Sequence, residues 1–138
     1  AASDVYKRQG GLRALGALLD RPDDVLLHLL HAMLYNLASD SAPRLRLLSK
    51  FLDPRKVEAV VEARETGASV DGRVSANAVL AWLAMEDDTL QALVTTRVPA
   101  AELAEALEGA EFDPRCVVAS GDTLEAITHA LTAYLRSL

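Results

Sequence analysis

The sequence predicts an all-α fold, and three observations support this prediction. Of the 138 residues, 51% are hydrophobic and only 4% aromatic, and the apolar set is rich in Leu and Ala, which both have high helix propensity. Apolar residues recur three and four positions apart, the spacing of one helix face, as in Leu12, Leu15, Leu18 and Leu19. Short connectors rich in Asp, Ser, Gly and Pro separate these segments.

Capping residues indicate where several of the helices begin. Asp23 is a suitable N-cap for a helix that extends to about residue 38. Asp53-Pro54 opens another helix, because proline is well tolerated at the first helical position. Asp87-Asp88 caps a short helix, and Val98-Pro99 begins the next one. Glu65 to Gly72 is expected to be a polar loop. The remaining helices are predicted over residues 12–19, 44–51, 73–85 and 124–135.

Each predicted helix has an apolar stripe. In the helix that follows Asp23, the stripe includes Val25, Leu26, Leu29, Leu30, Met33, Leu34 and Leu37. In the helix that follows Asp53, the expected buried face is Val57, Val60 and Val61. Near residue 105 we expect Leu103 and Leu107 to face inward, because they are four positions apart on one side of a helix.

The first nine residues have the features of a non-native tail. They read AASDVYKRQ, which matches, codon for codon, the translation of a common transposase-based sequencing adapter. We therefore leave residues 1–9 out of the fold argument and treat residues 10–138 as a C-terminal fragment of a longer protein. The alternative is a genuine polar N-terminal tail.

Charge and cysteine content restrict the classes of partner. The formal net charge is −6, which disfavours nucleic-acid backbones and anionic membrane surfaces. The single cysteine, Cys116, cannot form an intramolecular disulfide or a cysteine-based metal site. This is typical of a reducing compartment, so we expect a cytoplasmic or nuclear location. No apolar run approaches the roughly 20 residues that span a bilayer.

The longer helices share an internal repeat. Residues 32–38 (AMLYNLA) align with 78–84 (AVLAWLA) and, more weakly, with 130–135 (ALTAYL). The separation is 46 residues from Leu37 to Leu83 and 52 residues from Leu83 to Leu135. These periods are near or slightly above the roughly 40–47 residues of HEAT and armadillo repeats. An apolar helix also recurs before each long one.

In these segments the chain resembles the armadillo-repeat family. Residues 10–19 with the LYNLA segment at 34–38 look like the family's second and third helices, and the short helices near 44–51 and 88–96 look like its first helix. The resemblance covers nearly all of residues 10–138 and weakens toward the C-terminus. It implies an armadillo/HEAT-like right-handed α-solenoid fragment of about two and a half to three repeats, whose units stack to share one core.

The resemblance also implies a protein-binding groove, lined by the third helices. Asn36 matches a position at which the family commonly places an Asn that hydrogen-bonds the backbone of an extended peptide. The equivalent residues are Trp82 and Tyr134, so a full ladder of Asn is absent. Because Trp and Tyr are favoured interface anchors, we expect a mixed groove with Tyr35 and His31 as neighbours. The alternative for Trp82 and Tyr134 is packing inside the core.

Two further polar patterns have an ordinary and a functional interpretation. His28 and His31 share a helix face, but no nearby Cys or carboxylate group completes a metal site, so we expect no bound metal. Glu102, Glu105 and Glu108, followed by Glu111, form an acidic stripe. Such a stripe can meet a basic partner, and the alternative is a solvated helix face.

The sequence contains no recognisable catalytic motif. It has no phosphate-binding glycine loop and no G-x-S-x-G nucleophile segment. We therefore expect a protein-interaction scaffold that binds a protein or peptide, is not an enzyme, and uses no cofactor or small-molecule substrate. The alternatives are a nucleotide-exchange cofactor of Hsp70 chaperones with the same fold, and a structural or regulatory helical segment of a larger enzyme or tether.

Overall fold

The computed structural model describes residues 16–67, 69–110 and 124–138, and all regular structure in these ranges is helical. The all-α prediction is therefore confirmed. The predicted segment 12–19 is described only from Gly16, with residues 16–18 helical, and Cys116 and Glu111 lie outside the described residues. The helices are α2 (Asp24–Asn36), α3 (Ser41–Leu48), the 3-10 helix η1 (Ser49–Leu52), α4 (Pro54–Thr66), α5 (Val70–Glu86), α6 (Asp88–Arg97), α7 (Ala100–Glu108) and α8 (Leu124–Ser137).

Aspartate caps fix the starts of α2, α4 and α6, as predicted. The Asp23 carboxylate accepts a hydrogen bond from the Leu26 amide at 2.8 Å. Asp87 accepts from the Thr89 amide at 2.8 Å, and Asp53 caps α4 in the same way. Each carboxylate satisfies amide groups that have no partner inside the first helical turn.

The connection between α4 and α5 is shorter than the loop predicted over 65–72. Helix α4 continues to Thr66 and α5 begins at Val70, because Ser69 accepts a hydrogen bond from the Gly72 amide at 2.9 Å. The Ser69 hydroxyl also donates to the Asp24 carboxylate at 2.6 Å. A Cβ atom at Gly72 would collide with that carboxylate. The first residue of α2 is therefore in close contact with the first turn of α5.

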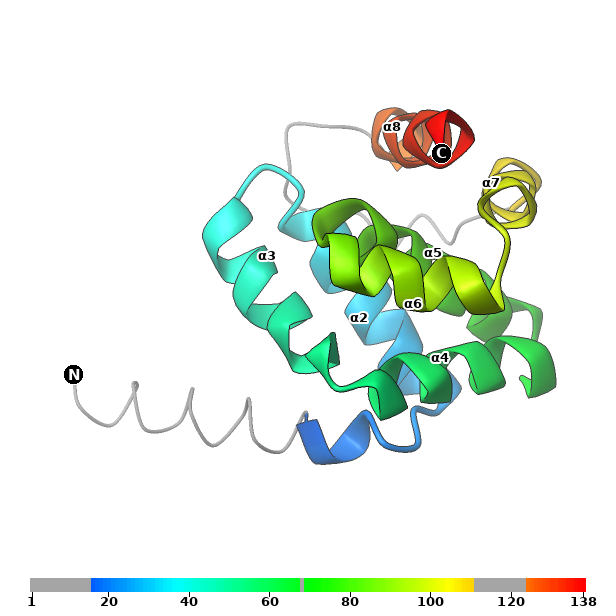
Figure 1. Ribbon diagram of the computed structural model, residues 1–138. Helices are drawn as coiled ribbons and strands as arrows, with labels where there is room; N and C mark the ends of the chain where they lie inside the picture. Colours follow the sequence, from blue (N-terminus) through cyan, green and yellow to red (C-terminus); the bar gives the residue numbers. More distant parts are fainter. Residues whose placement is uncertain (1–15, 68, 111–123) are drawn as a thin grey trace.

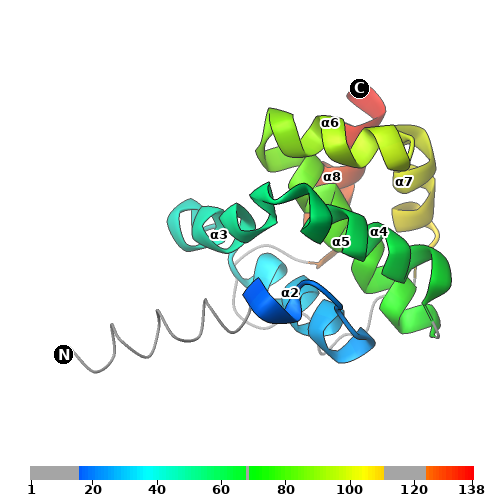
Figure 2. The same cartoon turned by 60° about the horizontal axis from the view of Figure 1, so that its bottom comes forward.

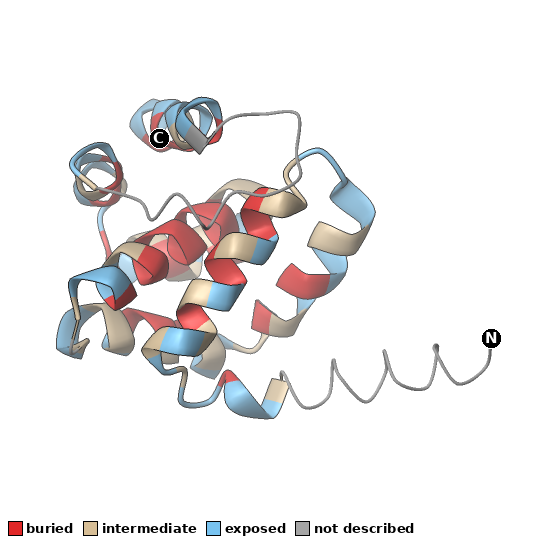
Figure 3. Cartoon of the chain, turned by 180° about the vertical axis from the view of Figure 1, so that it is seen from behind, coloured by how far each residue is buried: buried red, intermediate tan, exposed pale blue. Residues whose placement is uncertain are grey.

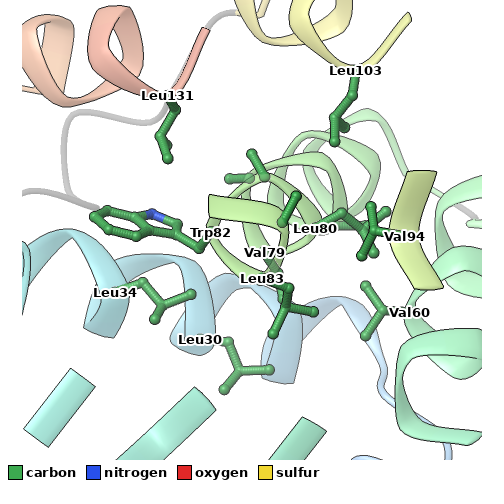
Figure 4. Packing of buried hydrophobic residues seen from close by; sticks show 14 of the residues in the cluster. Leu30, Leu34, Val60, Val79, Leu80, Trp82, Leu83, Val94, Leu103 and Leu131 are labelled. Carbon is green, nitrogen blue, oxygen red and sulfur yellow. The ribbon is translucent and has the colours of Figure 1, made fainter. Parts of the chain in front are cut away.

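Helix α5 lies at the centre of the described structure. It packs against α2, α4, α6, α7 and α8, and Figure 1 shows these helices around it. Every residue of α5 from position 75 to position 84 is buried. A helix that is apolar on all sides is expected in such a position. Figure 4 shows Val79, Leu80 and Leu83 of α5 among side chains from the surrounding helices.

Two groups of three described α-helices follow α2, and in each group the last helix is the longest. Helix α3, of 8 residues, is followed by α4, of 13, and α5, of 17. Helix α6, of 10 residues, is followed by α7, of 9, and α8, of 14. Within these groups α4 packs on α5 and α7 packs on α8, and α5 contacts both α2 and α8 (Figure 2). The same two kinds of contact are thus made twice.

Helix α2 has apolar residues on both of its sides. Leu27, Leu30, His31, Leu34 and Tyr35 are buried, and the strongest described contact of α2 is with α5. On the opposite side, three large residues of the predicted apolar stripe are exposed: Val25 (68%), Leu29 (53%) and Met33 (42%). The stripe therefore does not form one buried face, because α5 covers only the other side of α2 (Figure 3).

Candidate functional site

The outer face of α2 is the most prominent apolar feature of the described surface. We define it by Val25, Leu29, Met33 and Asn36. The first three are spaced four residues apart and the last completes three helical turns, so all four lie on one side of the helix. Apolar side chains exposed singly are ordinary, whereas a continuous row of them indicates an interaction site. Asn36, half-buried, adds an amide at the C-terminal end of this row.

A hollow extends the outer face of α2 toward α4. Its volume is about 430 Å³, and Val25 belongs both to the hollow and to the apolar row. The other lining residues come from the segment before α2, from its first turn and from the end of α4: Pro22, Asp23, Asp24, Ala63, Thr66 and Gly67. The hollow is large enough to accept a side chain of a bound segment.

Three of the predicted groove residues lie together, but inside the molecule. Tyr35 is edge-on to Trp82, with ring centroids 6.0 Å apart, and to His31, at 4.7 Å. The three residues are 0%, 3% and 1% exposed respectively. The Tyr35 hydroxyl lies 3.0 Å from the hydroxyl of Thr128 on α8. These residues lie inside because Tyr35 and His31 are on the side of α2 that faces α5, so they do not line an exposed groove.

Burial also determines the charge state of His31. Desolvation, and secondly the charge of nearby His28, lowers the pKa of His31 to about 4, so the ring is neutral near pH 7. Its Nδ1 atom is 3.5 Å from the Ser75 hydroxyl of α5. Among the described residues, no three His, Cys, Asp or Glu side chains are grouped to hold a metal.

Tyr134, the fifth predicted groove residue, connects α8 to other helices. Its hydroxyl accepts a hydrogen bond from Gln91 of α6 at 2.7 Å. The same Gln91 amide donates to the backbone carbonyl of Ala84 at 3.2 Å. Tyr134 is half-buried, and the hydrogen bond of its side chain is with α6 rather than with α2. The structure therefore does not bring the Tyr134 hydroxyl to the outer face of α2.

A cavity lies between α5 and α8, beside the aromatic rings of His31, Tyr35 and Trp82. We call it the Trp82 cavity. It has a volume of about 270 Å³ and is lined by Ala38, Arg44, Trp82, Met85, Ala126, Ile127, Ala130 and Leu131. Most of these side chains are apolar, and four of them come from α8. The cavity is partly open to the surface, since its lining residues Ala126 and Ala130 are exposed.

Arg44 is the charged residue of the Trp82 cavity, and its charge is used within the protein. Its guanidinium lies over the Trp82 ring, 5.4 Å from the ring centroid, at a distance typical of cation–π contacts. It forms an ion pair with Glu86 at 2.9 Å and donates to the carbonyls of Leu37 and Ala38 at the end of α2. The sequence shows Arg44 only as a charge in a short helix, so its role was not predicted.

The predicted acidic stripe on α7 is largely paired within the chain. Glu102 accepts from Arg64 of α4 at 3.0 Å, and Glu108 pairs with Arg136 of α8. Among the described carboxylates of the stripe, Glu105 alone forms no ion pair with another described residue, and it is exposed. The stripe therefore connects α7 to its neighbours and offers little free charge to a basic partner.

In the described part of the chain, none of the helices is long and apolar enough to cross a membrane.

Comparison with known proteins finds no relative. No family model, no curated protein and no solved structure with which we compared the chain shows a match.

Proposed function

We propose that the chain is an armadillo-like α-solenoid segment that acts as a protein-interaction scaffold, and that it binds a peptide or helix of its partner on the outer face of α2. The observation that carries this proposal is the exposed row of Val25, Leu29 and Met33, with Asn36 on the same side of the helix. A peptide laid on this row would bury apolar surface, and the Asn36 amide can both donate to and accept from its backbone.

The recurring helix contacts support the solenoid part of the proposal. In an armadillo-like arrangement α2, α5 and α8 would be successive third helices, and α5 does contact both of the others. Helices α4 and α7 would be the second helices that pack on them. Each unit of such an array covers one side of its neighbour, which accounts for an inner helix buried on all sides and an outer one with an apolar face.

The buried groove candidates have a supporting role in this proposal. Tyr35, His31 and Trp82 hold α2 against α5, and thereby fix the direction of the outer face of α2. We propose no catalytic function for the chain, and a location in the cytoplasm or nucleus in keeping with its single cysteine.

The outer face of α2 alone supports only weak binding. Full burial of a Val, Leu or Met side chain contributes about 1.5–3 kcal/mol, and these three are roughly half exposed, so covering them contributes about 3 kcal/mol in total. Micromolar affinity needs about 8 kcal/mol. We therefore expect a partner to use the adjoining hollow at Pro22 and Ala63 as well.

A display library of random peptides, selected on the folded chain, tests the proposal. Selected peptides should lose at least about tenfold in affinity for Leu29→Asp, because a carboxylate in the row stays solvated and resists burial. Leu52→Asp is the matched control, since Leu52 on η1 is also 53% exposed. Equal binding to the wild type and both variants would show that α2 is not the binding face.

Asn36→Ala separates the polar from the apolar part of the interaction. If the amide binds a peptide backbone, affinity should fall by roughly fivefold to tenfold. Unchanged affinity, with the Leu29→Asp effect intact, would remove Asn36 from the site and leave an apolar face.

A further inference from the structure

We infer that the Trp82 cavity is a binding site for a small uncharged molecule with an apolar body and one hydrogen-bond acceptor. The inference concerns a different place from the outer face of α2, and it does not depend on the proposed function. It departs from the expectation of no small-molecule substrate, which rested on the absence of catalytic motifs and not on the interior of the fold.

The size and lining of the cavity suit a compact apolar body. Its volume of about 270 Å³ exceeds that of an apolar protein cavity known to hold benzene, about 150 Å³. Six of the eight lining residues are Ala, Met, Ile or Leu. Contact with these side chains gives a ring-sized molecule the dispersion and desolvation energy that dominates small-ligand sites.

The acceptor requirement comes from the Trp82 indole. Trp82 is only 3% exposed, and its Nε1 atom has no hydrogen-bond acceptor in the described part of the chain. A buried donor without a partner costs about 1–3 kcal/mol. Figure 4 shows the indole nitrogen on the edge of the ring turned toward Leu131 of α8, another lining residue. A carbonyl oxygen placed at that edge of the cavity would satisfy this donor.

The electrostatics of the cavity favour an uncharged molecule. Arg44 is the only charged residue among the described residues that line the cavity, and Glu86 balances it at 2.9 Å. Its guanidinium also donates to two backbone carbonyls. An anion would therefore compete with existing partners, and an added charge of either sign would pay its desolvation cost without a dedicated counter-ion.

A water molecule fits this cavity less well than an organic ligand. Buried waters typically make two to four hydrogen bonds. Among the described lining side chains only Arg44 and Trp82 carry polar groups. The Arg44 Nη1 atom donates to two backbone carbonyls, and its Nε atom forms an ion pair with Glu86 rather than a hydrogen bond. The Trp82 cavity thus offers one strong donor in apolar surroundings, which matches a single acceptor on an apolar body.

Nuclear magnetic resonance of the indole N–H is the direct test, because the chain has a single tryptophan. Cyclohexanone is titrated into the ¹⁵N-labelled full chain, and methylenecyclohexane, which has nearly the same shape without the oxygen, is titrated separately. We expect cyclohexanone to shift the indole proton downfield saturably. It should bind roughly fivefold to tenfold more tightly than the hydrocarbon, because only the ketone pairs with the donor.

A matched pair of substitutions on α8 locates the binding. Ala130→Leu fills the cavity that Ala130 lines and should abolish the shift. Ala133→Leu, the same change at an exposed position of the same helix, should leave it unchanged. Unaltered backbone amide spectra verify that both variants are folded.

Three results would overturn the inference. A lack of saturable shift with either compound would remove the site. Equal affinity for the ketone and the hydrocarbon would remove the role of the Trp82 donor. A shift that persists in Ala130→Leu would place the binding elsewhere. If Ala130→Leu shows structural changes, Ala126→Leu fills the same cavity from one turn earlier and repeats the test.

Discussion

Helices α2 and α5 have similar apolar sequences and opposite surroundings. Helix α5 is buried on every side between positions 75 and 84, whereas α2 is buried on one side and exposes Val25, Leu29 and Met33 on the other. The difference lies in their neighbours, since α5 contacts five described helices and α2 packs mainly on one of them. Whether an apolar helix face belongs to the core or to an interface therefore depends on which elements cover it. The composition of the face alone does not decide this.

Leucine truncation in the two helices should give the largest contrast. Leu83→Ala in α5 removes a fully buried side chain and should lower the free energy of unfolding by about 2–5 kcal/mol. Leu29→Ala in α2 should change it by no more than about 0.5 kcal/mol. Urea denaturation measures both. A loss of more than about 2 kcal/mol for Leu29→Ala would show that α2 is covered on both sides.

The buried side of α2 should give the fold a pH dependence of stability. Because the pKa of His31 is lowered to about 4 in the folded state, against about 6.5 when unfolded, the unfolded chain binds the proton more readily. The stability due to neutral His31 is complete above about pH 6.5 and is lost as the pH falls toward 4. The shift corresponds to roughly 3 kcal/mol.

Denaturation from pH 7 to pH 4 measures this effect. His31→Gln should flatten the slope of stability against pH, and His28→Gln, a change on the same helix at a less buried position, should leave most of the slope in place. Parallel slopes for the wild type and His31→Gln would assign the pH dependence to other groups.

A smaller effect is expected where the two helices meet. A methyl group in Gly72→Ala would force the Asp24 carboxylate away from α5, with loss of the Ser69–Asp24 hydrogen bond. We expect a destabilisation of about 1–2 kcal/mol. Gly109→Ala is the control, because its added methyl meets only one atom, at 3.6 Å. Thermal unfolding compares the two, and equal midpoints would mean that Asp24 moves aside without cost.

The sequence predicts helix starts well because caps are local interactions. Asp23, Asp53 and Asp87 each bond to an amide two or three residues along the chain. The end of the loop predicted over residues 65–72 was less accurate than these helix starts. Helix α5 begins inside that segment, because Ser69 accepts a hydrogen bond from the Gly72 amide. Such a cap is visible in the sequence, but the glycine beside it favours a loop interpretation.

The buried side of α2 was not predictable in the same way. Apolar residues occur nearly all around this helix, including both Leu29 and Leu30, so helical periodicity does not single out one face. The exposure of Leu29 and the burial of Tyr35 depend on where α5 lies. Of the predicted groove residues, only Asn36 lies on the outer face.

The Trp82 cavity needed the tertiary structure for the same reason. Arg44 and Trp82 are 38 positions apart, and the α8 residues that close the cavity lie more than 40 positions further on. No local pattern connects these segments. The sequence marked Trp82 as a candidate anchor, but only the packing of α8 over α5 shows that Trp82 lines a cavity.

The aspartate caps have a consequence for the rate at which the chain folds. Because Asp23, Asp53 and Asp87 act within one turn, helix boundaries can form before distant segments meet. Several of the helix pairs that pack together, such as α4 with α5 and α7 with α8, are consecutive along the chain. Folds dominated by such short-range contacts reach the native state in microseconds to milliseconds, and we expect this chain to be among the fast folders.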